Sequence, residues 1–283
     1  MGARNESWAT GAIAKLKADG FLDSPNSGQV LWHELDLTTP ALVKLSAEES
    51  MKRETRLDVI VNNAATAQTN PTAFEHVKDS KIPVINLMST NHIGPFALTT
   101  ALLPLIKKTA AEPGSDVRVV MVSSVVHSQA SGVDWENPEG WGFKSRGFIP
   151  DTFLYGTTKL ANILFAKQLQ RNFDQEKVNA LAIALHPGSV DTGGFQDTLL
   201  RDSRWGFLTY YSLWLAGQML SPAEGAYTSL YASTSRHIFA DRSRYAGAYI
   251  MPFGTLAEPS KEARDPVAAQ KMWMATEKVI SAT

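Results

Sequence analysis

The chain has 283 residues, of which 44% are hydrophobic and 19% are charged, and its formal net charge is −1. This composition excludes a disordered protein, and the balanced charge excludes the basic surface typical of nucleic-acid-binding proteins. The absence of cysteine rules out disulfide bonds, thiolate metal sites and a cysteine nucleophile. Residues 1–20 lack the apolar core of a signal peptide, so we expect a cytoplasmic protein. From the balanced charge, we expect no nucleic-acid partner.

The most apolar segment spans residues 205–220. It is shorter than the roughly 20 residues that a transmembrane helix needs, and it contains polar residues. We therefore expect no transmembrane segment and interpret this stretch as a buried or pocket-lining helix. The alternative is a peripheral contact with a membrane surface or with a greasy substrate.

Short apolar runs alternate with helical patterns along the chain. The apolar runs predict strands at residues 29–33, 57–61, 117–122, 178–185 and 248–251. The helical patterns lie at residues 7–19, 40–52, 87–108, 152–171, 221–233 and 266–281. The middle three runs are almost continuously apolar, as in strands that are buried on both faces. The alternation therefore predicts an α/β fold with a doubly wound parallel sheet.

Small or polar residues follow the three middle strands, and α/β proteins place their sites at such strand ends. NNAA at residues 62–65 follows the first, and its small residues would let a ligand approach the backbone. A serine pair at 123–124 follows the second, and the turn HPGSVDT at 186–192 follows the third. Each motif alone is equally typical of an ordinary loop or turn.

The sharpest local signal is the sequence YGTTK at residues 155–159. On a helix, residues four apart share a face, so the ammonium of Lys159 can lie close to the phenol of Tyr155. A nearby cation favours the ionised form of a phenol, and such a tyrosine can exchange a proton with an alcohol or carbonyl oxygen. A tyrosine four residues before a lysine often occurs by chance. The catalytic interpretation of this pair is strengthened by the order in which the other motifs follow along the chain.

Taken in order, these motifs resemble the short-chain dehydrogenase/reductase family. The matching segments are NNAA at 62–65, NHIGPF at 91–96, VSS at 122–124, YGTTK at 155–159 and HPGSVDT at 186–192. The resemblance runs from about residue 1 to residue 280. Within the family, the sequence is most similar to the retinol dehydrogenase and protochlorophyllide reductase-like branch. The similar features are residues 155–169, EPS at 258–260 and the long segment before Tyr155. The resemblance to the family implies a Rossmann-like fold and a single domain over residues 1–283.

The resemblance implies a catalytic role for four of these residues. Tyr155 would be the general acid and base, and Lys159 would assist it and bind the nicotinamide ribose. Ser124 would hydrogen-bond the substrate oxygen, and Asn91 would hold a water molecule in a proton relay behind Lys159. The hydride chemistry would belong to a nicotinamide cofactor that the protein positions.

Further cofactor contacts follow from the same resemblance. The residues expected to line the adenosine and ribose side are Asn62, Asn63 and Ala64, with Asp36 beside the adenine. Those expected to close over the nicotinamide and its carboxamide are Pro187, Gly188, Val190 and Thr192. Arg4 follows the match to the family's second strand, where an arginine suits the 2′-phosphate of NADP(H) and an acid would suit NAD(H). We therefore expect NADP(H), unless Arg4 is a frayed terminal residue.

One feature of the family is missing from the sequence. Family members begin with a strand, a glycine-rich turn and a helix whose N-terminus receives the pyrophosphate. Here residues 1–5 match the end of the second strand, and the only Gly-x-Gly, at residues 140–142, lies in a loop. We expect a sheet without its first strand and helix, and therefore with unpaired edges. Either the chain is a shortened form of a longer protein, or its sheet closes in another way.

The substrate lid implied by the resemblance spans about residues 193–220. Its aromatic residues favour an apolar carbonyl compound or alcohol as substrate, although they would equally pack the lid itself. The insertion before Tyr155 would add a second wall. The aromatic residues concerned are Phe195, Trp205, Phe207, Tyr210, Tyr211 and Trp214 in the lid, and Trp135, Trp141, Phe143 and Phe148 in the insertion. The histidines show no metal-ligand spacing, so we expect no metal.

Two functional hypotheses follow. The first is an NADP(H)-dependent oxidoreductase that interconverts an apolar carbonyl compound and its alcohol by hydride transfer, with Tyr155 as acid and base. The second is a truncated, catalytically impaired family member that acts as a binding or assembly protein. A homodimer through the helices at 87–108 and 152–171 is expected from the resemblance alone.

Overall fold

The computed structural model describes residues 1–24, 27–66, 75–77, 81–138, 150–192 and 219–283, and positions 141, 196, 211, 212, 215 and 217. Its main sheet contains, in spatial order, β3 (Val59–Asn62), β4 (Val117–Val122), β5 (Ala180–Leu185), β8 (Tyr249–Met251) and β9 (Thr255–Ala257). The first four of these strands are parallel, and β9 is antiparallel to β8.

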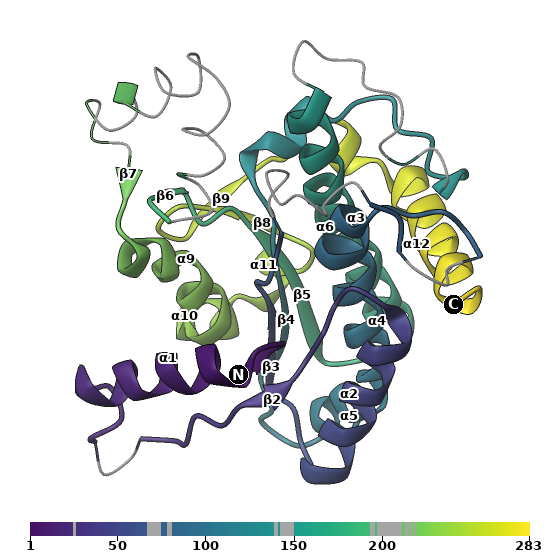
Figure 1. Cartoon of the computed structure of the whole chain (residues 1–283). Helices are drawn as coiled ribbons and strands as arrows, with labels where there is room; N and C mark the ends of the chain where they lie inside the picture. The colour runs from purple at the N-terminus through teal and green to yellow at the C-terminus, as the bar shows by residue number, and fades with distance from the viewer. Residues whose placement is uncertain are drawn as a thin grey trace.

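Helices cover both faces of this sheet (Figure 1). One side carries α2 (Pro40–Arg53), α3 (Asn86–Met88), α4 (Gly94–Ala101), α5 (Leu103–Ala110) and α6 (Pro150–Gln175), with α12 (Pro266–Ser281) outside α6. The other side carries α1 (Glu6–Ala18), α9 (Pro222–Thr234), α10 (Arg236–Ala240) and α11 (Arg242–Tyr245). This arrangement confirms the α/β fold with a mostly parallel sheet that the alternation predicts.

Most predicted elements form close to their expected bounds, and β4 and α12 match them to the residue. The strand predicted at 29–33 is an exception, because only His33–Glu34 forms β2. Its partner, β1, has two residues, so the apolar residues before His33 have no strand to pair with in the described chain. The helix predicted at 87–108 is divided into α3, a π-helical turn, α4 and α5.

Each face of the sheet has its own apolar core. On β4, Val119 and Met121 belong to the core beneath α4 and α6, whereas Val120 and Val122 pack toward α9 and α10. Successive side chains of a strand point to opposite faces, so a strand that is covered on both sides is apolar at nearly every position. The exception on β4 is Arg118, which is buried and forms an ion pair with Asp116. This double burial explains the continuous apolar runs in the sequence.

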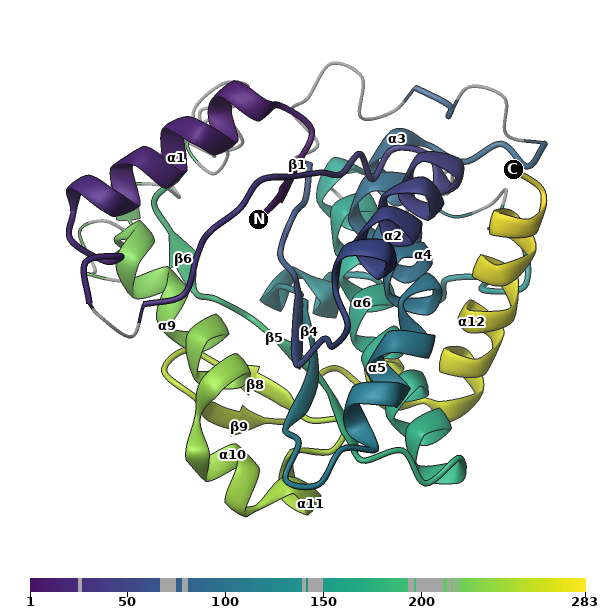
Figure 2. The same cartoon turned by 90° about the horizontal axis from the view of Figure 1, so that it is seen from below.

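The strands nearest the N-terminus form a separate small sheet. β1 (Gly2–Ala3) pairs in parallel with β2 (His33–Glu34), and neither is hydrogen-bonded to β3 in the part of the chain that the structure describes. Figure 2 shows the N-terminus and β1 set apart from β4 and β5. Val61 on β3 is 40% exposed, and α1 buries only Ala9. This division agrees with the expectation of a sheet that lacks one of its strands and has unpaired edges.

α12 covers the outer surface of α4 and α6. The indole of Trp273 stacks on Phe165 with ring centroids 5.4 Å apart, and it lies 4.7 Å from the ring of Phe96. Part of α6, one of the two helices expected to form a homodimer, is therefore already covered within the chain. The homodimer stays a prediction.

No helix among the described residues combines the length and apolar character needed to cross a membrane. The predicted lid at 193–220 lies mostly outside the described residues.

Gly94, at the start of α4, fixes the packing of the loop that follows β2. A Cβ atom at this position would lie 2.5 Å from the carbonyl oxygen of Leu37 and 2.8 Å from its Cβ. Any side chain here would therefore push the loop away from α4.

We predict that Gly94→Ala destabilises the fold by about 1–3 kcal/mol, because the backbone of Leu37 must move. Urea denaturation measures the change. Gly11 on α1 is a matched control, since no atom lies within 4 Å of its ideal Cβ position. Gly11→Ala should stabilise the protein by about 0.5–1 kcal/mol through helix propensity. An unchanged midpoint for Gly94→Ala would contradict the packing.

Candidate active site

The predicted catalytic residues come from three neighbouring segments. Asn91 lies in the π-helical turn η1 (Ser89–Ile93), Ser124 directly follows β4, and Tyr155 and Lys159 lie in the first half of α6. α6 packs against both β4 and η1. The fold therefore brings together residues that are far apart in the sequence, and π-helical turns are frequent at functional sites.

Tyr155 and Lys159 adopt the arrangement that their spacing predicts. The Nζ atom of Lys159 lies 5.3 Å from the centroid of the Tyr155 ring, and it donates a hydrogen bond to the carbonyl of Val122 at 3.1 Å. Lys159 is 2% exposed and Tyr155 is half-buried. An ammonium group has three N–H donors, and within the described chain Lys159 has no carboxylate partner. Two donors therefore remain for a ligand, which suits the hydroxyl pair of a ribose.

The two serines after β4 have different surroundings. Ser123 is buried, and its hydroxyl donates to the carbonyl of Lys159 at 2.7 Å, which fastens β4 to α6. Ser124 is half-buried and caps the short helix η2 (Val125–Gln129) by accepting a hydrogen bond from the backbone N–H of Val126. Its hydroxyl hydrogen has no acceptor among the described residues. Ser124 is thus the serine able to donate to a substrate oxygen.

η2 rests directly on α6 beside Tyr155. A Cβ atom at Gly156 would lie 2.6 Å from the carbonyl oxygen of Val126. Glycine within YGTTK therefore permits the close approach that keeps Ser124 near the Tyr155 end of α6.

Asn91 is 1% exposed and holds the loop that follows β3. Its Oδ1 accepts from the backbone N–H of Thr66 at 2.7 Å, and its Nδ2 donates to the Thr66 carbonyl at 3.0 Å. Nδ2 also lies 3.3 Å from Oγ1 of Thr158, next to Lys159. The amide therefore ties the strand-end loop to α6, and the role of Asn91 in a water relay stays a prediction.

The residues after β3 differ in orientation. The side chain of Asn62 is buried and donates to Oγ1 of Thr99 at 3.0 Å and to Sδ of Met121 at 3.1 Å. It therefore points into the core, and only its backbone remains at the strand end. Asn63 and Ala64 are exposed. The predicted cofactor surface at this strand consequently depends on Asn63, Ala64 and the backbone.

The turn after β5 is held by a second short strand pair. β6 (Ser189–Val190) is parallel to β7 (Met219–Leu220), and Gly188 has φ +101°, a value that favours glycine. The backbone N–H of Thr192 donates to the carbonyl of Val190 at 2.9 Å. This turn carries the four contacts predicted for the nicotinamide end, Pro187, Gly188, Val190 and Thr192.

The two residues predicted for the adenosine end lie on the small sheet. Arg4 is exposed directly after β1, and Asp36 is half-buried after β2, where Oδ1 accepts from the backbone N–H of Thr38 at 2.9 Å. The small sheet and the main sheet are not joined by hydrogen bonds in the described residues. The nicotinamide end of the predicted cofactor site is therefore more completely built than the adenosine end.

His127 lies directly beside the candidate site, on the short helix that follows Ser124. Its Nδ1 donates to the carbonyl of Ser124 at 2.7 Å, and its Nε2 accepts from the backbone N–H of Ser260 at 3.0 Å. The ring therefore joins Ser124 to the EPS segment. The sequence singled out EPS at 258–260 as a family-like motif. It did not indicate that His127 is the residue that contacts this motif.

Trp135 and Trp141 do not line a substrate pocket, contrary to the expectation. They are 5% and 1% exposed, and their rings pack edge to face with centroids 5.7 Å apart. Trp141 also packs against His92. Both residues belong to the apolar core on the α6 side of the sheet. Tyr211 is 43% exposed, and the other aromatic residues named for the pocket lie outside the described residues.

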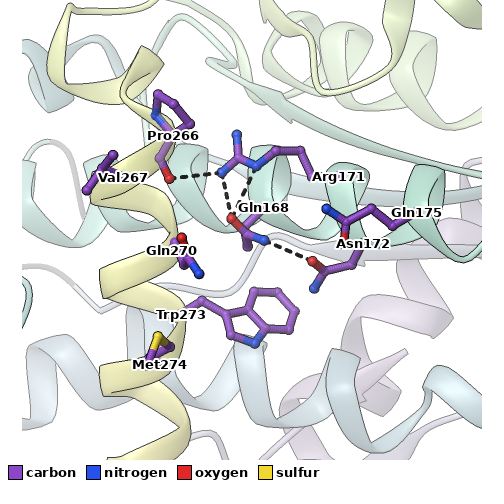
Figure 3. A pocket seen from close by; sticks show the side chains of 9 residues that line it. All are labelled: Gln168, Arg171, Asn172, Gln175, Pro266, Val267, Gln270, Trp273 and Met274. Carbon is purple, nitrogen blue, oxygen red and sulfur yellow. Dashed lines mark hydrogen bonds between the residues drawn. The ribbon is translucent and has the colours of Figure 1, made fainter.

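A cavity of about 430 Å³ lies between α6 and α12 (Figure 3), and none of the predicted catalytic residues is among those that line it. Gln168 on its wall is nine residues beyond Lys159 along α6. Its Nε2 donates to Oδ1 of Asn172 at 2.8 Å, and its Oε1 accepts from Arg171 at 2.6 Å. Because these polar groups bond to each other, we assign no chemistry to this cavity.

Two buried histidines flank the site and are neutral at neutral pH. Burial lowers the pKa of His92 to about 4. Burial, followed by the charges of His127 and Lys159, lowers the pKa of His186 to about 4. Both rings take up protons more readily in the unfolded chain, where the reference pKa is about 6.5. Folding stability should therefore fall as the pH decreases from about 6.5 to about 4.

We predict that this loss is about 1 kcal/mol per pH unit for each of the two rings. Urea denaturation at a series of pH values measures the slope. His186→Phe should remove about half of it, whereas His237→Asn on the exposed surface of α10 provides a matched histidine control. A slope unaffected by His186→Phe would show that His186 is not neutral in the folded protein.

The comparisons agree on one family. The model of the short chain dehydrogenase family matches residues 3–133. A short-chain dehydrogenase/reductase of Armillaria gallica is 38% identical over 286 residues, which covers 99% of this chain and 84% of that protein. Retinol dehydrogenase 14 of Mus musculus is 30% identical over 290 residues, which covers 99% of this chain and 77% of that protein.

Among solved structures, NADPH-bound carbonyl reductase from chicken fatty liver has the same fold. Its TM-score is 0.58 at 20% identity, and the match covers 90% of this chain and 81% of the reductase. The chain belongs to the short-chain dehydrogenase/reductase family of oxidoreductases, within the retinol dehydrogenase-like branch.

Proposed function

We propose that this protein is an NADP(H)-dependent oxidoreductase that interconverts an apolar carbonyl compound and its alcohol, with Tyr155 as acid and base. The observation that supports it most is the buried ammonium of Lys159. Its Nζ atom lies 5.3 Å from the centroid of the Tyr155 ring, and two of its N–H donors remain available to a ligand. Ser124, at the adjoining strand end, offers a hydroxyl hydrogen beside them. These are the groups that a carbonyl reduction needs from the protein.

A bound nicotinamide would supply the hydride in reduction and accept it in oxidation. The chain's own residues manage the proton and the orientation. Tyr155 gives its hydroxyl proton to the carbonyl oxygen in reduction and takes it back in oxidation. Ser124 donates a hydrogen bond to the same oxygen and holds it near Tyr155. The charge of Lys159 stabilises the phenolate that remains on Tyr155.

Separate residues would hold the two ends of the cofactor. Lys159 would bind the nicotinamide ribose through its remaining donors, and the turn after β5 would cover the ring. Asn63, Ala64 and Asp36 would contact the adenosine side, and Arg4 would bind the 2′-phosphate. The preference for NADP(H) is supported by Arg4 and by the NADPH bound to the carbonyl reductase of the same fold.

The substrate class and the cellular setting belong to the same proposal. The name of one relative, retinol dehydrogenase, refers to an apolar alcohol, and the aromatic content of residues 193–220 suits such a substrate. We place the protein in the cytoplasm as one domain over residues 1–283, with the lid at about residues 193–220.

We predict that Tyr155→Phe lowers turnover at least about 100-fold, because the aromatic ring stays in place but loses the hydroxyl group that gives and takes the proton. Loss of NADPH absorbance with benzaldehyde as the test carbonyl measures turnover. Binding of NADPH should persist. Tyr227→Phe, which removes a hydroxyl from an exposed ring on α9, should leave turnover unchanged. Substantial activity in Tyr155→Phe would remove Tyr155 from the acid and base role.

We predict that Arg4→Ala weakens NADPH binding about tenfold and leaves NADH binding unchanged, because only NADPH carries the 2′-phosphate. Titration of the 283-residue chain, followed by nicotinamide fluorescence, measures both affinities. Lys17→Ala on the exposed surface of α1 is the matched charge control. Failure of the unaltered chain to bind either cofactor would instead favour a catalytically impaired binding or assembly protein.

A further inference from the structure

His92 connects three helices in the interior of the protein. It is 0% exposed and follows Asn91 in η1. Its Nδ1 lies 3.3 Å from Oδ1 of Asn162 on α6, and its Nε2 lies 3.1 Å from Oγ1 of Thr276 on α12. The ring therefore has a polar partner on each side.

The directions of these hydrogen bonds follow from the chemistry of the partners. Asn162 donates through Nδ2 to the carbonyl of Val122 at 3.4 Å, so its Oδ1 is the atom that accepts from Nδ1–H of His92. Burial keeps the ring neutral by lowering the pKa of His92 to about 4, so Nε2 is an acceptor. The hydroxyl of Thr276 has a single hydrogen and lies within hydrogen-bond distance of both the Met272 carbonyl, at 2.8 Å, and Nε2, at 3.1 Å. With the ring hydrogen on Nδ1, we infer that this hydrogen is directed to Nε2 instead of the Met272 carbonyl.

This chain of hydrogen bonds ends at the candidate catalytic lysine. The Val122 carbonyl accepts from Asn162 and also from Nζ of Lys159, at 3.1 Å. It is the one protein acceptor that Lys159 has within the described residues. Anything that moves the Asn162 amide or the end of β4 therefore moves the acceptor that orients the ammonium.

Packing alone does not explain a histidine at this position. The ring is surrounded by Phe96, Trp141 and Phe165, with centroids 6.1, 6.4 and 6.5 Å away. A phenylalanine would suit such aromatic surroundings, whereas a buried polar ring costs free energy unless both nitrogens are hydrogen-bonded. The two polar contacts of His92 are therefore the feature that a phenylalanine could not replace.

We propose that His92 is a positioning residue, which α12 holds through Thr276 and which orients Asn162 so that Val122 and Lys159 stay aligned. The expected effect on turnover rests on the proposed function of Lys159. The protonation and hydrogen bonds of the His92 ring do not depend on that function. The proposal makes α12 part of the active site's support, although none of its residues is at the strand ends.

Three variants test the kinetic part. Thr276→Val removes the hydroxyl without a large change of shape, and we expect kcat with NADPH and benzaldehyde to fall about fivefold, with KM changed by less than about twofold. Thr276→Ser keeps the hydroxyl and should restore kcat. Thr228→Val on α9 is the matched control, because Thr228 is also 0% exposed and has no partner among the described residues.

The result that would overturn the proposal is a lower melting temperature in Thr276→Val without any change in kcat, since this is what a purely structural hydroxyl would give. A fall in kcat that Thr276→Ser does not restore would also contradict it.

A second measurement does not depend on turnover. Nitrogen NMR of the histidine-labelled chain should show His92 at neutral pH as the neutral ring with its hydrogen on Nδ1. The Nε2 signal should shift in Thr276→Val and not in Thr228→Val. A charged ring, or a hydrogen on Nε2, would refute the proposal. If the unaltered chain shows no turnover, the proposed function fails. The nitrogen signals of the His92 ring then test its hydrogen-bond arrangement by themselves.

Discussion

The ammonium of Lys159 is enclosed by protein, and in the described chain its one protein acceptor is the carbonyl of Val122. Removing a cation from water is costly, so this group must be held firmly by the atoms around it. Ser123 fastens the backbone of Lys159 to β4, and Asn162 shares the Val122 carbonyl. The Tyr155 ring lies along the same helix face. Much of the local structure thus serves to place one charge beside one phenol.

The divided sheet sets the rigidity of the two halves of the site. The residues proposed for catalysis rest on the five-stranded sheet, which has a core on each face. Arg4 and Asp36 rest on β1 and β2, which are two residues long, and on the mostly exposed α1. Stability is not uniform when burial is so unequal. We therefore expect the nicotinamide end to be pre-organised and the adenosine end to be the more easily deformed.

α12 contributes to the protein in two ways that use different sides of the same interface. Trp273 stacks on Phe165 and stabilises the packing against α6. Thr276, one helical turn further on, contacts His92 instead of an apolar ring. The covering helix therefore supplies both apolar burial and a directed hydrogen bond, which links the periphery of the fold to Lys159 through named contacts.

The sequence by itself determined the elements and the order of the motifs, because strand and helix periodicities are local. It predicted β4, α12 and the shared face of Tyr155 and Lys159. Only the tertiary structure decided that Asn62 turns inward, that Trp135 and Trp141 belong to the core, and that His92 meets Thr276, 184 residues away. Such contacts depend on how α6, η1 and α12 pack together, and no pattern of neighbouring residues encodes that packing.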